Sequence, residues 1–133
     1  MLLVASALTG LLLKITVPMN YAVAELRPDA LQRLEQLQAQ TRLSALAAAQ
    51  AYLYFGTDYE ASMPSRIQVS EAAVGTDVMR VRFHDPSVQD DSVYQTCDRI
   101  YLRQDPEGRW QAFKHEWSHK GRGRLGWTTQ PTS

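Results

Sequence analysis

Cysteine and net charge are what this sequence of 133 residues has least of, and each shortage excludes a class of protein. The single cysteine, Cys97, cannot form an internal disulfide, which excludes a disulfide-built secreted scaffold and a zinc site made of several cysteines. Fourteen basic residues balance fourteen acidic ones, so the chain has no strong overall field to attract nucleic acid. We therefore expect no nucleic-acid partner, and no motif predicts a cofactor.

The sequence also lacks internal repeats and any linker long enough to separate two domains. A length of 133 residues fits a single domain. We expect that domain to occupy residues 25–119. The remaining end, residues 120–133, has three basic and no acidic residues and is rich in Gly, Thr and Pro, so we expect a flexible basic tail there.

An apolar start is what the sequence has in excess. Ten of the first thirteen residues are Leu, Val, Ala or Met, and Lys14 is the only charged residue within residues 1–24. Such a segment directs a chain to the lipid bilayer, either as a retained membrane helix or as a removable signal peptide. A buried core helix is the third alternative. As a helix, residues 1–24 would measure about 36 Å, enough to cross a hydrocarbon core of about 30 Å.

Three features leave the choice between anchor and signal peptide open. Ala22-Val23-Ala24 has the small residues of a cleavage site, which favours removal. No Lys or Arg precedes the apolar run, so the basic start of a signal peptide is missing, which favours an anchor. Lys14 interrupts the run and makes it a marginal membrane span. Such a span is easier to stabilise beside other membrane helices than alone in lipid. The segment therefore also predicts a partner in the membrane.

One long helix is predicted after this segment. Arg27-Pro28-Asp29 suits a helix start, because proline fits the first turn and Asp29 complements the positive end of the helix dipole. Leucine and alanine residues then recur every three or four positions and give one apolar face: these are Leu31, Leu34, Leu37, Leu43, Leu46, Ala49 and Leu53. The pattern predicts a single amphipathic helix that ends near Phe55-Gly56.

Four antiparallel strands are predicted after this helix. Alternating apolar residues and enrichment in Tyr, Thr, Ile and Val mark them at residues 67–69, 79–83, 93–103 and 109–119. Residues 105–108, Asp-Pro-Glu-Gly, suit the last hairpin turn, with proline second and glycine fourth. Arg80 and Arg82 fall on the face opposite the apolar residues of their strand. The predicted fold class is therefore α+β, with an N-terminal membrane helix followed by one long helix packed on a four-stranded antiparallel meander sheet.

Residues 115–119 read His-Glu-Trp-Ser-His and match the H-E-x-x-H motif of zinc proteases letter for letter. That motif works on a helix, where positions i and i+4 share one face close together. Here it follows a hairpin turn in a predicted strand, where His115 and His119 would lie about 13 Å apart. Zinc–nitrogen bonds of about 2.1 Å cannot span that distance. We therefore assign no metal ligands, and a zinc hydrolase ranks third among the candidate functions.

Two stretches of the chain are similar to one known family. Residues 99–118, RIYLRQDPEGRWQAFKHEWS, resemble the closing hairpin of the nuclear-transport-factor-two-like superfamily, a cystatin-like cone. Residues 47–58, AAAQAYLYFGTD, resemble the end of that superfamily's first helix and its Gly-x-Asp loop. The family's second and third helices have no room between Asp58 and Arg66. The resemblance therefore implies either a conical sheet with a pocket or a simpler helix-on-sheet, cystatin-like form.

The resemblance also implies two kinds of function. Some members of the superfamily are enzymes with an Asp or His base inside the cone, whereas others are catalytically silent and pair or dock through the open sheet face. Bitopic assembly proteins of bacterial type IV secretion systems are much longer but similar in layout, with one membrane span followed by such a domain in the periplasm.

Binding rather than catalysis is the function that we expect. The chain would be a membrane-anchored accessory or assembly subunit of a bacterial envelope complex, which binds other envelope proteins or a second copy of itself. We place it in the inner membrane with a periplasmic domain, although Lys14 and Arg27, counted alone, would put the domain inside. The alternative is a small pocket enzyme or ligand carrier of the cone fold.

Aromatic and histidine side chains supply the candidate binding residues: Trp110, Phe113, His115, Trp117 and His84. The three aromatic residues fall on both faces of the last strand, so at least one is exposed or covered by a partner. The pocket alternative would combine one of the histidines with a carboxylate, for which Asp58, Asp98 and Glu116 are available. We assign no catalytic residue, and we expect Cys97 to be a small buried side chain.

Overall fold

The computed structural model describes residues 20–88, 93–121 and 126–129. Most of the predicted membrane segment, residues 1–19, lies outside the described residues, as does much of the predicted basic tail. Within the described ranges, neither helix is long and apolar enough to cross a membrane. The membrane helix of the expected fold therefore stays a prediction.

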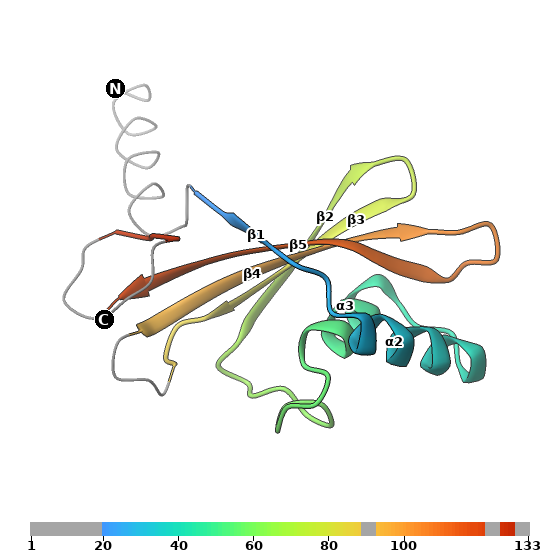
Figure 1. Cartoon of the computed structure of the whole chain (residues 1–133), viewed down its shortest axis with the longest axis horizontal. Helices are drawn as coiled ribbons and strands as arrows, with labels where there is room; N and C mark the ends of the chain where they lie inside the picture. Colours follow the sequence, from blue (N-terminus) through green and yellow to red (C-terminus); the bar gives the residue numbers. More distant parts are fainter. Residues whose placement is uncertain (1–19, 89–92, 122–125, 130–133) are drawn as a thin grey trace, which may run out of the picture.

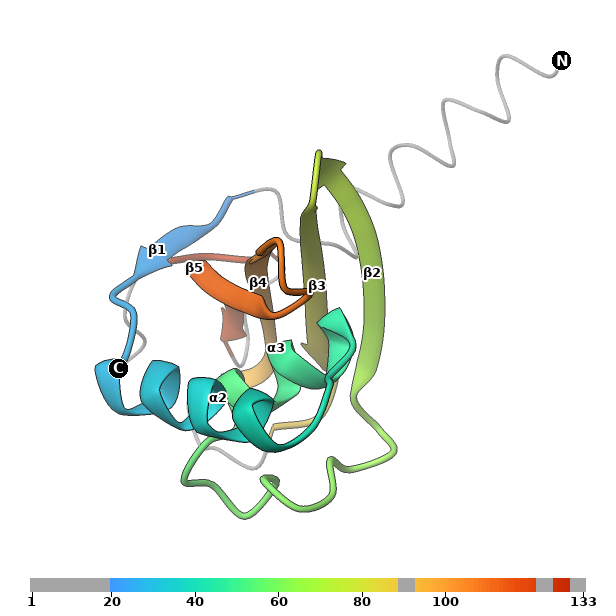
Figure 2. The same ribbon diagram turned by 90° about the vertical axis from the view of Figure 1, so that its right-hand side faces the viewer.

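The described residues form an α+β fold, as predicted, in which two helices pack on an antiparallel sheet of five strands (Figure 1, Figure 2). The helices are α2 (Pro28–Gln40) and α3 (Ala45–Leu53). The strands are β1 (Ala22–Ala24), β2 (Gln68–Gly75), β3 (Val78–Asp85), β4 (Val93–Gln104) and β5 (Trp110–Gly121). Their order is β1-β5-β4-β3-β2, so β2 to β5 form the predicted meander and β1 adds at the outer edge of β5.

The single long helix predicted from the leucine pattern is wrong, because the chain breaks between Gln40 and Ala45. Thr41 has an extended backbone (φ −150°, ψ 149°), and Ser44 begins the next helix by accepting a hydrogen bond from the amide of Ala47. A serine that caps a helix N-terminus in this way stabilises it by about 1 kcal/mol. The apolar positions continue across the break, so periodicity alone does not reveal it.

The predicted sheet of four strands is one strand short, because Ala22–Ala24 forms a fifth. Ala22 pairs with Trp117 and Ala24 with His115 in antiparallel register. These residues belong to the segment that the sequence suggested as a membrane anchor or a cleavage site. A strand of three residues is too short to show alternation, so no pattern marks it in the sequence.

The hydrophobic core lies between the two helices and one face of the sheet. Its largest fully buried side chains come from α3, β3 and β4, among them Tyr52, Phe83, Ile100 and Leu102. Ala48 and Ala49 of α3 are fully buried as well. Their small side chains let α3 approach the sheet closely, so that the interior can pack at normal density.

The turn between β4 and β5 forms where the sequence predicts it. The amide of Gly108 donates to the carbonyl of Asp105 at 3.0 Å, and Gly108 has a φ of +87°, which a residue without a Cβ atom tolerates best. The carboxylate of Asp105 accepts hydrogen bonds from the amides of Glu107 and Arg109, both at 2.9 Å. This turn fixes the register of β5, the strand that carries most of the candidate residues.

Candidate functional site

The sheet has two faces of different character. On one face, which we call the helix face, core residues such as Phe83 and Ile100 lie beneath α2 and α3. On the other face, Arg82 lies opposite Arg99, and Arg99 lies opposite Glu116. We call this second face the open face, because no described helix covers it (Figure 2).

Charge is segregated between these two faces. On the helix face of strands β2 to β5, the ionisable side chains are acidic residues and histidines: Glu71, Asp85, Asp98, His115 and His119. On the open face of the same strands the charged side chains are mostly basic: Arg80, Arg82, Arg99, Arg103, Lys114 and Lys120, with Glu116, and His84 lies there as well. Successive side chains of a strand point to opposite faces, so alternation in β3 and β4 produces this separation. The open face is strongly positive although the whole chain is neutral.

Arg99 lies at the centre of the open face. Its Nη2 atom is 2.7 Å from Oε1 of Glu116, and only 21% of the Arg99 side chain and 11% of the Glu116 side chain are exposed. The guanidinium also lies 3.5 Å from the ring centre of Tyr21. Burial raises the pKa of Glu116, but a hydrogen bond from Tyr101 and the charges of Arg99 and Lys114 outweigh it and hold that pKa below its ordinary value.

Tyr21 connects the start of the described chain to this cluster. Its hydroxyl lies 3.4 Å from Sγ of Cys97, and its ring covers the guanidinium of Arg99. Cys97 is fully buried, as predicted. Burial raises the pKa of the Tyr21 hydroxyl and that of the Cys97 thiol, so both remain neutral near pH 7. The residue just before β1 is therefore a packed part of the domain.

Aromatic rings alternate with cations farther along the open face. Lys114 lies 5.2 Å from the ring centre of Tyr101, and Arg103 lies 4.7 Å from that of Phe113. The two rings are 6.2 Å apart. Cations attract aromatic rings at these distances, so the rings help to hold the basic side chains in place. Phe113 remains 38% exposed, as one of three large apolar side chains that stay exposed among the described residues.

A β-bulge in β5 places Phe113 on the open face. Leu102 pairs with Ala112 and Tyr101 pairs with Lys114, which leaves Phe113 as an extra residue. With strict alternation from the following residues, Phe113 would instead lie on the helix face. Its exposure agrees with the prediction that this strand carries at least one exposed or partner-covered aromatic residue.

His84 joins three strands across the open face. Its Nδ1 and Nε2 atoms lie 3.1 Å from Oε1 of Gln68 in β2 and 3.0 Å from Oε1 of Gln95 in β4. Its ring also meets the ring of Trp127 edge-on, with centroids 5.5 Å apart. These contacts occupy both ring nitrogens and fix the imidazole in one position within the domain.

The five candidate binding residues divide between the two faces. Phe113 and His84 lie on the open face, whereas Trp110, His115 and Trp117 lie on the helix face, so the five do not form one site. The sequence analysis missed the most polar part of the open face, Arg99, Tyr101 and Arg103. The signal was present, because these three residues alternate with apolar ones along the same predicted strand.

The zinc-protease-like motif at residues 115–119 lies on strand β5, as predicted. His115 faces Tyr52 of α3, with ring centroids 6.2 Å apart, whereas Glu116 lies on the open face. The histidine and the glutamate therefore point away from each other and cannot act on one metal ion. Within the part of the chain that the structure describes, no group of three His, Cys, Asp or Glu side chains is placed to hold a metal.

A second candidate site lies on the helix face, in a pocket of about 410 Å³ between the end of α3 and strands β3 and β4. Tyr54, Asp58 and Asp98 are among its lining residues. Oδ1 of Asp98 lies 2.8 Å from Nε2 of His115, so two groups named from the sequence do converge. Burial, followed by the negative charges of Asp98 and Asp85, raises the pKa of Tyr54. The pocket wall can therefore accept a proton or a hydrogen bond at Asp98 and donate one at Tyr54.

Arg66 neutralises a second carboxylate of this pocket. Its Nε and Nη2 atoms lie 3.0 Å and 3.2 Å from the two carboxylate oxygens of Asp85, and Nη2 also donates to the hydroxyl of Tyr59 at 2.9 Å. These hydrogen bonds raise the pKa of Arg66 above its ordinary value. Such a two-point arginine–carboxylate pair is rigid, so it shapes the pocket, and Asp98 and Asp58 are the other two carboxylates that line it.

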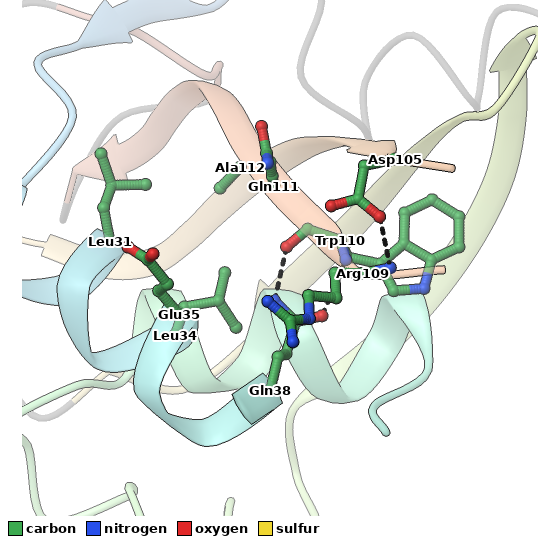
Figure 3. A pocket seen from close by; sticks show the side chains of 9 residues that line it. All are labelled: Leu31, Leu34, Glu35, Gln38, Asp105, Arg109, Trp110, Gln111 and Ala112. Carbon is green, nitrogen blue, oxygen red and sulfur yellow. Dashed lines mark hydrogen bonds between the residues drawn. The ribbon is translucent and has the colours of Figure 1, made fainter. Parts of the chain in front are cut away.

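Trp110 borders a smaller pocket of about 340 Å³ between α2 and the start of β5 (Figure 3). Gln38 points from α2 toward the backbone of Trp110. Its Nε2 atom donates to the carbonyl of Trp110, and its Oε1 atom accepts from the amide of Trp110, both at 2.7 Å. These reciprocal bonds fasten α2 to the sheet, and the geometry favours a structural role for Trp110.

Comparison of the chain with protein-family models, with curated proteins and with solved structures found no match. The resemblance of residues 99–118 to the nuclear-transport-factor-two-like superfamily therefore stays a prediction. Any functional proposal rests on the contacts of this chain's own residues, of which those on the open face and around Asp98 are the most distinctive.

Proposed function

We propose that this chain is a membrane-anchored accessory or assembly subunit of a bacterial envelope complex, which acts by protein–protein binding through its α+β domain. The apolar N-terminal segment holds it in the inner membrane, and the domain lies in the periplasm. The open face of the sheet carries this proposal: both described helices pack on the other face, and Phe113 is 38% exposed among cations. Aromatic residues and arginine are the residue types enriched at protein interfaces.

The contacts of β1 and Tyr21 support a retained anchor over a removable signal peptide. Cleavage after Ala24 would remove β1, which pairs with β5, and would also remove the tyrosine ring that covers Arg99. The edge of β5 would then present unpaired backbone groups. A segment that completes the fold in this way belongs to the mature protein. The residues before Tyr21 would span about 30 Å as a helix, which matches the hydrocarbon core.

Photo-crosslinking of the full-length chain in living cells of its own bacterium tests the binding role. A photoreactive amino acid replaces Phe113 on the open face, and a matched control carries it at Gln36, an exposed position on α2. We expect position 113, and not position 36, to give a discrete adduct with another envelope protein or with a second copy of the chain. Mass spectrometry of the adduct identifies the partner.

Two outcomes would contradict the proposal. The first is a chain that gives no adduct at position 113 and runs as a lone monomer in detergent. The second concerns the anchor and comes from N-terminal sequencing of membrane and soluble fractions. Met1 in the membrane fraction agrees with a retained anchor, whereas a soluble chain that begins at Glu25 excludes it.

A small pocket enzyme or ligand carrier is the second candidate function, and the bond between Asp98 and His115 beside the 410 Å³ pocket favours it. A carboxylate oriented by histidine on a pocket wall is a suitable hydrogen-bond or proton acceptor. The test is a small-molecule screen by thermal shift with the full-length chain and the Asp98→Asn variant. A ligand that raises the Tm of the unchanged chain and not that of Asp98→Asn would support a ligand-binding role for the pocket. A screen without such a ligand would count against that role.

A further inference from the structure

The less exposed carboxylates of the helix face are paired, whereas several arginines of the open face are not. On the helix face, Asp85 pairs with Arg66 and Asp98 pairs with His115. On the open face, Glu116 pairs with both Arg99 and Lys114. No carboxylate of the described residues lies within ion-pairing distance of the other open-face arginines, which are Arg80, Arg82 and Arg103. The open face therefore keeps positive charge for which the described domain has no counter-charge.

Arg82 and the paired Arg99 are also placed at a cost to stability. Arg82 lies directly opposite Arg99 in the register of β3 and β4. Like charges directly opposite each other on antiparallel strands are destabilising. The Nε atoms of both arginines are buried without a hydrogen-bond partner. A buried donor without an acceptor is a further penalty to stability.

An apolar group stands beside this positive charge. Phe113 is exposed, contacts the guanidinium of Arg103 and lies against the ring of Tyr101. An occupant that fits the open face must therefore supply negative charge to the arginines and apolar surface to Phe113. A protein segment with acidic and apolar side chains supplies both.

We propose that the open face binds an acidic protein segment, whose carboxylates pair with Arg80, Arg82 and Arg103 and whose apolar side chains cover Phe113. This inference rests on the proposed function, a domain that binds proteins, and names the chemistry of the partner. Single carboxylates fit the geometry better than a lipid surface does. Arg80 and Arg82 are half-buried between neighbouring strands, so an individual carboxylate can approach them more closely than a flat layer of headgroups can.

Fluorescence anisotropy with a defined probe tests this proposal. The probe is a fluorescein-labelled peptide of repeated Glu-Glu-Trp, and the protein is the full-length chain in a neutral detergent. One variant combines Arg80→Gln, Arg82→Gln and Arg103→Gln. The matched control combines Arg33→Gln, Arg42→Gln and Arg109→Gln, which removes the same charge from exposed positions outside the open face. Circular dichroism confirms that both variants are folded.

We expect the open-face variant to bind the peptide about tenfold or more weakly than the unchanged chain, because three ion pairs are lost. The control variant should change the affinity less than twofold. Phe113→Ala should weaken binding as well, without changing its salt dependence, because it removes apolar contact and no charge. Equal binding by the open-face and control variants would overturn the proposal, as would no binding by the unchanged chain.

Competition separates an acidic protein from other anions. Phosphatidylglycerol mixed into the detergent micelles, or a single-stranded oligonucleotide, is added to the complex of chain and peptide. If either one releases the peptide from the unchanged chain at lower concentration than unlabelled peptide does, the open face is a lipid or nucleic-acid site and the proposal is wrong. An adduct at position 113 that persists with the three arginines replaced would leave the proposed function standing and refute the acidic partner alone.

Discussion

The helix face and the open face are built from alternate residues of the same strands, yet they differ in how their charges are satisfied. Asp85 and Asp98 on the helix face each have a partner of opposite charge or a histidine within 3.0 Å. The open face keeps two arginines, Arg82 and Arg99, directly opposite each other, whereas no like charges are opposed on the described helix face. Each face has a buried nitrogen without an acceptor, at Arg82 and Arg99 on the open face and at His119 on the helix face. The comparison suggests that one face is arranged for stability and the other for a partner, because natural proteins keep local conflicts mainly where function needs them.

Two phenylalanines, one on each face, give the largest expected contrast. Phe83 on the helix face is 1% exposed, whereas Phe113 on the open face is 38% exposed. We expect Phe83→Ala to lower the free energy of unfolding by about 3–5 kcal/mol, because it leaves a cavity in the core. Phe113→Ala should lower it by about 1–2 kcal/mol, since more than a third of that residue is already exposed and its removal leaves no enclosed cavity. Urea unfolding of both variants in detergent measures the difference.

Similar losses from the two substitutions would mean that Phe113 is covered within the chain itself, and that the open face belongs to the domain's own core. A smaller loss of stability from Phe113→Ala, together with weaker binding of the acidic peptide, would support a face kept for a partner.

Glu116 provides the next largest effect, because it is the acidic residue at the centre of the open face. Glu116→Gln removes the charge that pairs with Arg99 and Lys114. We expect the free energy of unfolding at pH 7 to fall by about 1–3 kcal/mol, the usual effect of losing one hydrogen-bonded charged group. Urea unfolding at neutral pH measures it, with Glu107→Gln as the control, since Glu107 is exposed and only distantly paired with Arg109.

The stabilisation by Glu116 should also depend on pH in a predictable direction. Its pKa is lower in the folded domain than the ordinary value of 4.5, so the folded state favours the charged carboxylate. Its contribution is therefore complete above about pH 4.5 and is lost as the pH falls through the lowered pKa. The Glu116→Gln variant should lack this part of the acid-induced loss. Parallel acid losses for the two proteins would mean that Glu116 is not held charged by Arg99.

The sequence predicted the class of fold and one half of the charge pattern, and particular residues explain the rest. Alternation around Val81 and Phe83 correctly placed Arg80 and Arg82 on the opposite face. The bulge at Phe113 changes the alternation in β5, and nothing in the local sequence marks an extra residue there. The approach of Asp98 to His115 follows from the register of two strands, which the sequence of either strand alone does not contain.

The role of the N-terminal segment was the hardest part to predict, because its residues suit several environments. Ala22-Val23-Ala24 has the composition of a cleavage site and equally that of a short edge strand. Only the position of β5 beside it decides between these structures. The break between α2 and α3, unlike the strand at Ala22–Ala24, does have a signal in the sequence. Ser44 before an Ala-rich run is a recognisable N-cap, although the continuous apolar pattern concealed it.

Substitution of Tyr21, at the edge of the open face, should lower the free energy of unfolding by a smaller amount. Tyr21→Ala removes the ring over Arg99, and we expect it to lower the free energy of unfolding by about 1–2 kcal/mol, as for a partly desolvated cation–aromatic contact. Tyr21→Phe keeps the ring and loses only the contact between its hydroxyl and Cys97, so it should be nearly neutral. Thermal unfolding in detergent measures both. If Tyr21→Ala unfolds like the unchanged chain, the segment before β1 does not contribute to the fold, and the argument for a retained N-terminus fails.

Arg82→Gln should change the free energy of unfolding least, and the sign of that change is the most informative. Because Arg82 lies opposite Arg99, its removal should raise the free energy of unfolding by about 0.2–1 kcal/mol at low salt, and the gain should shrink as salt screens the repulsion. Arg80→Gln is the control, since Arg80 lies opposite Tyr101 and should give no such gain. Urea unfolding at two salt concentrations measures both variants, and a loss of stability in Arg82→Gln would mean that Arg82 supports the fold. A variant that is more stable but binds the acidic peptide more weakly would mean that the two opposed arginines are kept for the partner, because selection for stability alone would replace one of them.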